Sequence, residues 1–197
     1  MSLFDNELSR RGLIRSLLTL PFVAFFCSLS RARTLEPTPE APDDDEPTPA
    51  QTEGPFYKPK TPKRASLIEK GFEGKKLIVE GQVLDTKGKP IAGALLDFWH
   101  CDATGEYDNA GYHGRGHQFA DGDGKWKLET IVPGLYPGRT RHIHVRVQKP
   151  NGRILTTQLY FPGEAGNARD GIYDRRLLMK VSEKESAQVG SFNFVLA

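Results

Sequence analysis

The sequence predicts an all-β protein that folds as an antiparallel β-sandwich with long loops. Two observations support this fold class. From residue 77 onward, short apolar runs alternate with turns rich in Gly, Pro and Asp, and no long helical period interrupts them, apart from a short helical pattern around residues 175–181. The expected strands read, in chain order, LIVEGQVL, ALLDFWHC, KWKLET, HIHVRVQ, RILTTQLYF and SFNFVLA. Short strands separated by tight turns are typical of sandwiches.

Residues 1–33 have the character of a targeting segment. Arg10 and Arg11 precede an almost wholly apolar run, residues 17–29, which is too short to span a bilayer comfortably. The arginine pair resembles a twin-arginine export signal. This predicts an exported protein, periplasmic or extracellular, with no stable membrane insertion after export. The alternative is an uncleaved amphiphilic anchor.

Residues 34–51 form a tract of Pro, Thr and acidic residues that predicts an extended linker, so the folded domain is expected to span residues 52–197. The chain has 27 Lys and Arg against 25 Asp and Glu, which argues against a nucleic-acid partner. The two cysteines are Cys27, in the apolar run, and Cys101. They cannot supply a disulfide framework for the domain.

Two further segments contain residue types that bind metals in other proteins. The DGDG sequence at residues 121–124 lacks the spaced acidic ligands and terminal Glu of a calcium loop, so it predicts a hairpin turn. His113 and His117 have the spacing of helical metal ligands, but glycines flank them on both sides. Glycine disfavours a helix, and we therefore expect both histidines to lie in a loop.

The strand HIHVRVQ at residues 142–148 is the main candidate for chemistry. Side chains alternate along a strand, so His142 and His144 share one face while the apolar residues share the other. Two histidines at i and i+2 can reach one metal ion, and Tyr136, just upstream, can supply an oxygen ligand if its phenol ionises. The alternative is a half-exposed strand whose histidines lie in solvent.

Several motifs follow one another along the predicted domain. They are TEGPFY at 52–57, V-x-G at 79–81, Gly88, LDFW at 96–99, G-x-Y at 105–107, D-x-x-G at 121–124, TIVPGLY at 130–136, R-x-x-H-x-H at 139–144 and TTQLYFPG at 156–163. In this order they resemble the intradiol ring-cleavage dioxygenases, and the protocatechuate 3,4-dioxygenase branch more than the catechol branch. The resemblance implies that residues 52–197 form a prealbumin-like antiparallel β-sandwich with long active-site loops.

The resemblance also implies one non-haem Fe(III) ion per chain, bound by Tyr107, Tyr136, His142 and His144. The residue types agree with this, because ferric iron is a hard Lewis acid and its charge can lower the pKa of tyrosine from about 10. By the same resemblance Tyr136 is both a ligand and a catalytic base, and Arg139 stabilises negative charge on the substrate. Gln158 is expected to orient an iron ligand or the substrate, the alternative being an amide on an edge strand. Tyr57 is expected to line the pocket or to pack, and Trp99 to pack in the core.

The implied reaction inserts both atoms of dioxygen into a catechol-type aromatic and opens the ring between the two hydroxylated carbons, giving a cis,cis-muconate-type product. The segment between Tyr136 and Arg139 is shorter than in many relatives, and Arg141 replaces a commonly small residue. No helical dimerisation region of the catechol branch is recognised, so a homo-oligomer remains an open expectation. A substrate carboxylate would need a cation, for which Arg141, Arg146 and a lysine near Tyr57 are the candidates.

Two other classes of protein share parts of this pattern. Secreted prealbumin-like binding modules share V-x-G at 79–81, G-x-P-x-x-G-A at 88–94 and D-x-D-G-x-W at 121–126, which report the sandwich and not catalysis. A zinc hydrolase would use His142 and His144 but needs a carboxylate or a third histidine. The two tyrosines and Arg139 favour the dioxygenase, because a binding module has no need for them.

Overall fold

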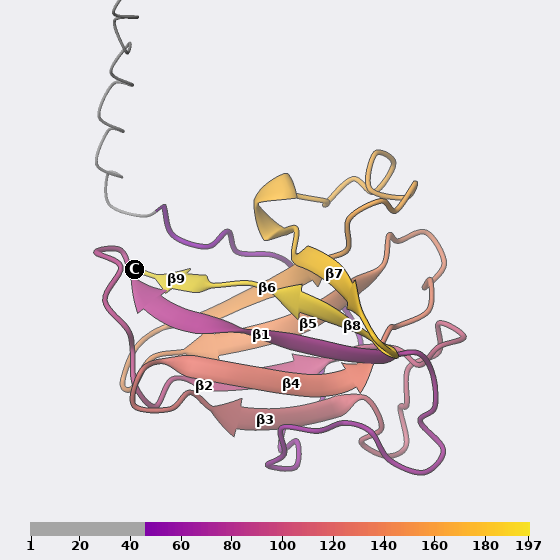
Figure 1. Cartoon of the computed structure of the whole chain (residues 1–197), viewed down its shortest axis with the longest axis horizontal. Coiled ribbons are helices and arrows are strands. Elements are labelled where there is room, and N and C mark those ends of the chain that lie inside the picture. The colour runs from indigo at the N-terminus through magenta and orange to yellow at the C-terminus, as the bar shows by residue number, and fades with distance from the viewer. Residues whose placement is uncertain (1–45) are drawn as a thin grey trace, which may run out of the picture. The chain divides into compact units, whose positions relative to one another are not determined.

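The computed structural model describes residues 46–197 (Figure 1). The predicted targeting segment and residues 34–45 of the predicted linker lie outside the described residues. One sheet contains β1 (Lys76–Asp85), β4 (Lys125–Ile131), β7 (Lys180–Lys184), β8 (Ala187–Ser191) and β9 (Phe194–Leu196). The other contains β2 (Leu95–Trp99), β3 (Arg115–Phe119), β5 (His142–Gln148) and β6 (Ile154–Tyr160). A 3₁₀ helix, Arg175–Leu177, precedes β7.

The strand order is β4-β1-β8-β7 in the first sheet, with β9 also beside β1, and β3-β2-β5-β6 in the second. All pairs in the second sheet are antiparallel. In the first sheet, β1 is antiparallel to β4 but parallel to β8 and β9. The predicted all-β sandwich is confirmed, with these parallel pairs as the one departure. They arise because the β7–β8 hairpin brings the chain back along β1 in the same direction.

The apolar face of β5 packs into the core between the sheets. Ile143, Val145 and Val147 are fully buried and belong to the same apolar cluster as residues of β1 and β4. On the opposite face His142 and His144 are only 4% and 3% exposed. The alternation predicted for this strand is confirmed, and a half-exposed strand with solvated histidines is excluded.

Three strands were not predicted, namely β3, β7 and β8, because none shows the alternation of apolar and polar residues typical of a half-buried strand. The expectation that His117 lies in a loop is wrong. It lies on β3, which pairs with β2 on one side and bridges to Lys63 on the other. The hairpin turn at 121–124 is present, since Gly124 N–H donates to Asp121 O at 3.0 Å.

The last residues of the predicted linker contact the domain. Thr48 N–H donates to Val195 O at 3.0 Å, and Gln51 N–H donates to Thr156 O at 2.8 Å. Ordered packing therefore begins upstream of residue 52, the expected domain start.

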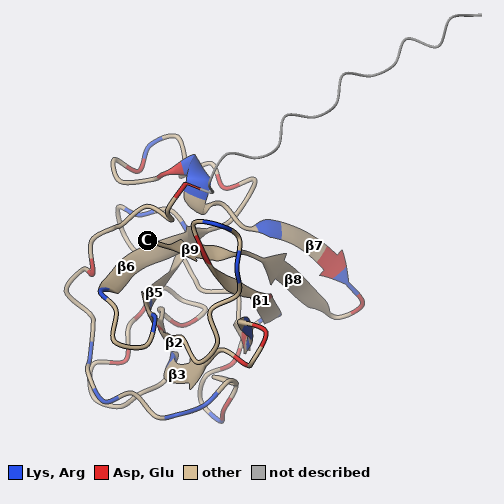
Figure 2. Cartoon of the chain, turned by 90° about the vertical axis from the view of Figure 1, so that its left-hand side faces the viewer, with Lys and Arg blue, Asp and Glu red and all other residues tan. Residues whose placement is uncertain are grey.

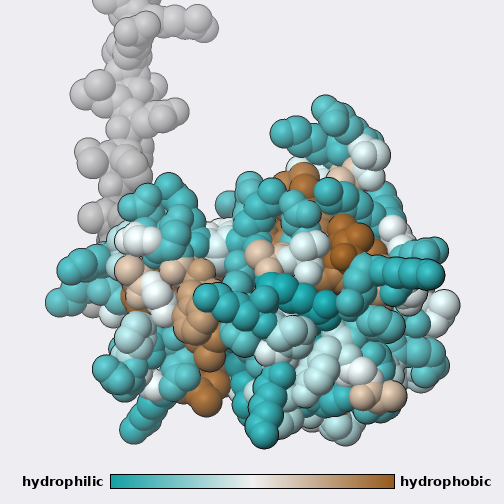
Figure 3. Space-filling view, turned by 90° about the horizontal axis from the view of Figure 1, so that it is seen from below, coloured by the Kyte–Doolittle hydropathy of each residue, from teal (hydrophilic) through white to brown (hydrophobic). Residues whose placement is uncertain are grey.

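Basic and acidic segments are interspersed over the loops in Figure 2, and in Figure 3 hydrophilic side chains surround smaller apolar groups. Over residues 46–197, no helix has the length and apolar character needed to cross a membrane.

Candidate metal centre

His142 and His144 lie side by side on β5, and Tyr107 reaches them from the loop after β2. The two imidazole Nε2 atoms are 3.1 Å apart, and the Tyr107 hydroxyl is 3.5 Å from Nε2 of His142. The ring of Tyr136, from the loop before β5, has its centroid 5.8 Å from that of Tyr107. The tertiary structure therefore brings all four predicted ligand residues into one cluster.

Gly105 allows the two tyrosine-bearing loops to cross. Its φ is +97°, and a Cβ atom at this position would lie 2.4 Å from the carbonyl oxygen of Leu135. Gly134 N–H also donates to Asp102 O at 2.7 Å, which ties the two loops together. Any larger residue at Gly105 would push apart the loops that carry Tyr107 and Tyr136.

Both histidines of the cluster are held in the neutral form. Burial lowers the pKa of His142 to about 4 and lowers that of His144 well below its ordinary value. His142 Nδ1 lies 2.6 Å from the carbonyl oxygen of Thr140. A carbonyl can only accept, so Nδ1 carries the proton and Nε2 presents a free lone pair toward the cluster. This is the tautomer that a metal-binding histidine requires.

Tyr107 needs a nearby positive charge before it can act as an anionic ligand. Burial raises its pKa well above the ordinary value of 10.0, although the charges of Arg139 and Arg115 act in the opposite direction. A bound metal ion is the kind of charge that can ionise a buried phenol. The site would therefore present a phenolate only when an ion of high charge is bound.

The donor set fits a hard, oxygen-preferring ion better than zinc. The Nε2 atoms of His142 and His144 lie 3.1 Å apart, so both could bind one ion. Within residues 46–197 no group of three or more His, Cys, Asp or Glu residues could hold a metal. The nearby His100 is engaged elsewhere, since its ring nitrogens contact Cys101 O and Thr130 Oγ1, each at 2.7 Å. The third histidine that a zinc hydrolase needs is not found there.

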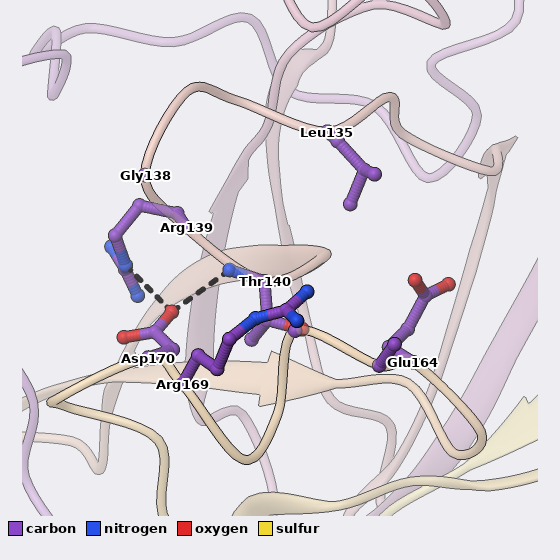
Figure 4. Close-up of a pocket in the computed structure, with 9 residues that line it drawn as sticks. Leu135, Gly138, Arg139, Thr140, Glu164, Arg169 and Asp170 are labelled. Atoms are coloured by element: carbon purple, nitrogen blue, oxygen red, sulfur yellow. Dashed lines mark hydrogen bonds and ion pairs between the residues drawn. The ribbon is translucent and has the colours of Figure 1, made fainter.

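Arg139 is fixed between two polar partners beside the cluster. Its Nε donates to Asp170 Oδ2 at 2.8 Å and its Nη2 donates to Gln158 Oε1 at 2.7 Å. Asp170 also accepts from the Thr140 amide, as Figure 4 shows. Gln158 lies opposite His144 in the β5–β6 register and donates to Thr52 O at 3.0 Å. Gln158 therefore holds the Arg139 guanidinium in place beside the predicted ligands.

Asp170 is the carboxylate that orients Arg139, and no sequence motif points to it. Burial acts to raise the pKa of Asp170, but hydrogen bonds from the amides of Thr140 and Ile172 and the contact with Arg139 lower it overall. The only local signal was an acidic residue in a glycine-containing loop after β6. Such a residue cannot be assigned to Arg139 without the tertiary structure.

Tyr57 packs on a residue that contacts one of the predicted ligands. Its ring packs edge-on against Trp99 at 5.0 Å, and its hydroxyl contacts Asp97 Oδ2 at 3.4 Å. Trp99 in turn stacks on His144, with centroids 4.8 Å apart and planes 4° apart. Trp99, expected to be a core residue, is buried and also fixes the orientation of the His144 ring. Tyr57 contributes to the centre through Trp99.

The cations proposed for a substrate carboxylate have partners within the protein. Arg141 pairs with Glu164 at 2.7 Å, and Arg146 pairs with Glu53 and covers the ring of Tyr57. Lys58 Nζ donates to two backbone carbonyls. None of the three is free to bind an anion without breaking these contacts.

A pocket of about 460 Å³ adjoins Arg139, between the loop that carries Tyr136 and the loop after β6 (Figure 4). Arg169 reaches across this pocket in the close-up, and among the described residues its side chain makes no ion pair or hydrogen bond. Leu135, on the opposite wall, is 54% exposed. The pocket thus combines an apolar wall with an unpaired cation.

The fold and the cluster define a β-sandwich protein with a buried candidate metal centre of two histidines and two tyrosines. Residues 52–197, more than half of the chain, match the family model described as dioxygenase. The chain belongs to the intradiol ring-cleavage dioxygenase family.

Relatives from both branches of the family match the chain. The chlorocatechol 1,2-dioxygenase of Rhodococcus opacus is 30% identical over 76% of this chain and 72% of its own length. The catechol 1,2-dioxygenase of Candida albicans is 30% identical over 73% of this chain, and the protocatechuate 3,4-dioxygenase beta chain of Burkholderia cepacia is 33% identical over 51%. The chain spans only 58% and 50% of the lengths of these last two relatives.

Among solved structures, the dioxygenase domain of a dioxygenase carbohydrate-binding protein fusion from Streptomyces sp. SirexAA-E is 52% identical, with a TM-score of 0.75. The match covers 77% of this chain and 98% of that one. The 3-chlorocatechol 1,2-dioxygenase of Rhodococcus opacus matches with a TM-score of 0.69 at 26% identity, over 77% of this chain and 73% of that one. The predicted sandwich is thus the fold of solved family members.

Proposed function

We propose that the protein is a non-haem Fe(III) intradiol dioxygenase. It inserts both atoms of dioxygen into a catechol-type aromatic and cleaves the ring between the hydroxylated carbons to give a cis,cis-muconate-type product. The observation that carries this proposal is the buried cluster of His142, His144 and Tyr107, with imidazole Nε2 atoms 3.1 Å apart. One ion per chain would be held by these three residues and Tyr136.

When bound, ferric iron would supply Lewis acidity that ionises the phenols and activates a catechol toward dioxygen. The chain's own groups then have separate roles. Tyr136, the less buried of the two tyrosines, would accept a proton from a substrate hydroxyl at its phenolate oxygen. Arg139 carries a permanent charge held in place by Asp170 and Gln158, and it would stabilise negative charge on the ring.

None of the four candidate ligands lines the pocket beside Arg139, so we propose that a catechol held at the cluster extends an anionic substituent into this pocket. Arg169 is the lining cation without a partner among the described residues, whereas Arg141 and Arg146 are each paired with a glutamate. A guanidinium binds a carboxylate with two parallel hydrogen bonds. We therefore assign the role of carboxylate partner to Arg169 in place of the three cations considered from the sequence.

The experiment that tests the proposal is the visible spectrum of the ferric protein, recorded anaerobically before and after a catechol is added. Phenolate-to-iron charge transfer should give a band that shifts with substrate, and His144→Ala should abolish it. The exposed His113 serves as the matched control, because His113→Asn removes an imidazole outside the cluster and should leave the band unchanged. Turnover under isotopically labelled dioxygen should place both atoms in the product.

A ferric protein with no band, and none after substrate is added, would instead favour the alternative, a prealbumin-like binding module without catalysis. A band that survives His144→Ala would move the metal away from the proposed cluster. These two outcomes separate an error in the function from an error in the ligand set.

We also propose that residues 1–33 direct export by the twin-arginine pathway, on the strength of Arg10 and Arg11 before an apolar run. Substituting both arginines by lysine should keep the full chain in the cytoplasm, as cell fractionation would detect. Secretion by the double variant at the wild-type level would contradict this route. We also propose that the chain forms a homo-oligomer. Light scattering of the purified chain would give its mass in solution and so test this assembly.

A further inference from the structure

Arg115, the first residue of β3, is a fully buried arginine without an acidic partner. It is 0% exposed, and among the described residues no carboxylate lies within ion-pair distance of its guanidinium. Its hydrogen bonds go to backbone carbonyls. Nη1 donates to Phe56 O at 2.6 Å, while Nε and Nη2 donate to Asp108 O at 3.3 and 3.2 Å. Buried arginines are normally paired, so this arrangement calls for a specific reason.

Both carbonyls belong to residues that position Tyr107. The ring of Phe56 stacks on that of Tyr107 with centroids 4.3 Å apart and planes 9° apart, and Asp108 is the next residue in the chain. The guanidinium carbon itself lies 5.9 Å from the centroid of the Tyr107 ring. Arg115 therefore fastens the segment before β1 to the loop after β2, with Tyr107 held between them.

We propose that Arg115 is a positioning residue for the metal centre, which fixes the Tyr107 ring and places a permanent positive charge beside it. This inference rests on the proposed function, because a metal-bound Tyr107 would add a negative charge near the guanidinium to those of Asp108 and Asp97. Arginine suits the position better than lysine, since its planar fork can reach two carbonyls at once. No local pattern points to this role, because Arg115 lies in a glycine-rich stretch far from the histidine pair.

Arg115→Met and Arg115→Lys separate the two parts of the role. Methionine removes both the charge and the fork, whereas lysine keeps the charge and loses the fork. Arg64 offers a matched control, because it also donates to two carbonyls near β3, those of Arg115 and Tyr112, but is paired with Glu69. The measurements are ferric iron affinity by chelator competition and the position of the charge-transfer band without substrate.

We expect Arg115→Met to weaken iron binding about tenfold or more, as loss of residues that orient metal ligands does. Its band should move to longer wavelength, because an electron leaves the phenolate more easily once the adjacent cation is gone. Arg115→Lys should bind iron less tightly than the wild type but keep the band position. Arg64→Met should change neither property.

The inference is overturned if Arg115→Met has the iron affinity and band of the wild type, or if Arg64→Met reproduces its changes. It is also overturned if Arg115→Lys shows the same displaced band as Arg115→Met. Should the methionine variant fail to fold, the lysine variant alone decides, because wild-type affinity in it would exclude the positioning role. A wild-type protein without any band would refute the proposed function instead.

Discussion

Asp170→Ala should be among the most damaging single substitutions near the site. The side chain is only 3% exposed and accepts hydrogen bonds from Arg139 Nε at 2.8 Å, the Thr140 amide at 2.9 Å and the Ile172 amide at 3.1 Å. A buried donor left without an acceptor costs about 1–3 kcal/mol. Arg139 is 20% exposed and can partly recover by binding water. We therefore expect a loss of about 3 kcal/mol in the free energy of unfolding.

The same substitution should reduce turnover, because Arg139 would keep only its contact with Gln158. A misplaced catalytic group commonly lowers kcat by about tenfold to a hundredfold. Urea unfolding followed by tryptophan fluorescence would give the stability change, and oxygen uptake with a saturating catechol would give kcat. Iron content should stay close to that of the wild type, since Asp170 is not a predicted ligand.

The control is Asp123→Ala, which removes an aspartate that is 73% exposed and paired with Lys125 at 3.3 Å. Exposed ion pairs contribute little, so its stability should change by less than about 0.5 kcal/mol. If Asp170→Ala matched this control in both unfolding and kcat, the view that Asp170 holds Arg139 in place would be wrong.

Three further predictions concern His100, Arg169 and Gly105. Burial lowers the pKa of His100 from 6.5 to about 4, so its contribution to stability should be complete above pH 6.5 and fall by about 3 kcal/mol toward pH 4. His100→Gln should remove this share in urea titrations and leave the share of the buried His142 and His144. Arg169→Gln should raise KM for protocatechuate about tenfold and leave KM for catechol unchanged in steady-state assays. Gly105→Ala should lower the free energy of unfolding by about 2 kcal/mol or more, because its Cβ would lie 2.4 Å from Leu135 O. The control Gly93→Ala, at φ +67° with open space around it, should lower it by about 1 kcal/mol in the same urea unfolding assay.

Local patterns in the sequence were sufficient for the strands that lie over the core. β5 matches the predicted HIHVRVQ because alternation of side chains is a property of neighbouring residues. β3 escaped prediction because it is held by β2 and by Lys63, and neither partner leaves a mark in the RGHQF sequence. Pairing with distant segments decided its conformation.

The sequence by itself determined the sandwich, the histidine face of β5 and the resemblance that named Tyr107, Tyr136 and Arg139. Only the tertiary structure decided how those residues are held. Asp170 is 31 positions from Arg139 and Phe56 is 59 from Arg115, yet each pair is in contact. Contacts of this kind depend on how loops cross, as at Gly105, and burial then sets the charge of each group. Neither loop crossing nor burial is encoded in the spacing of nearby residues.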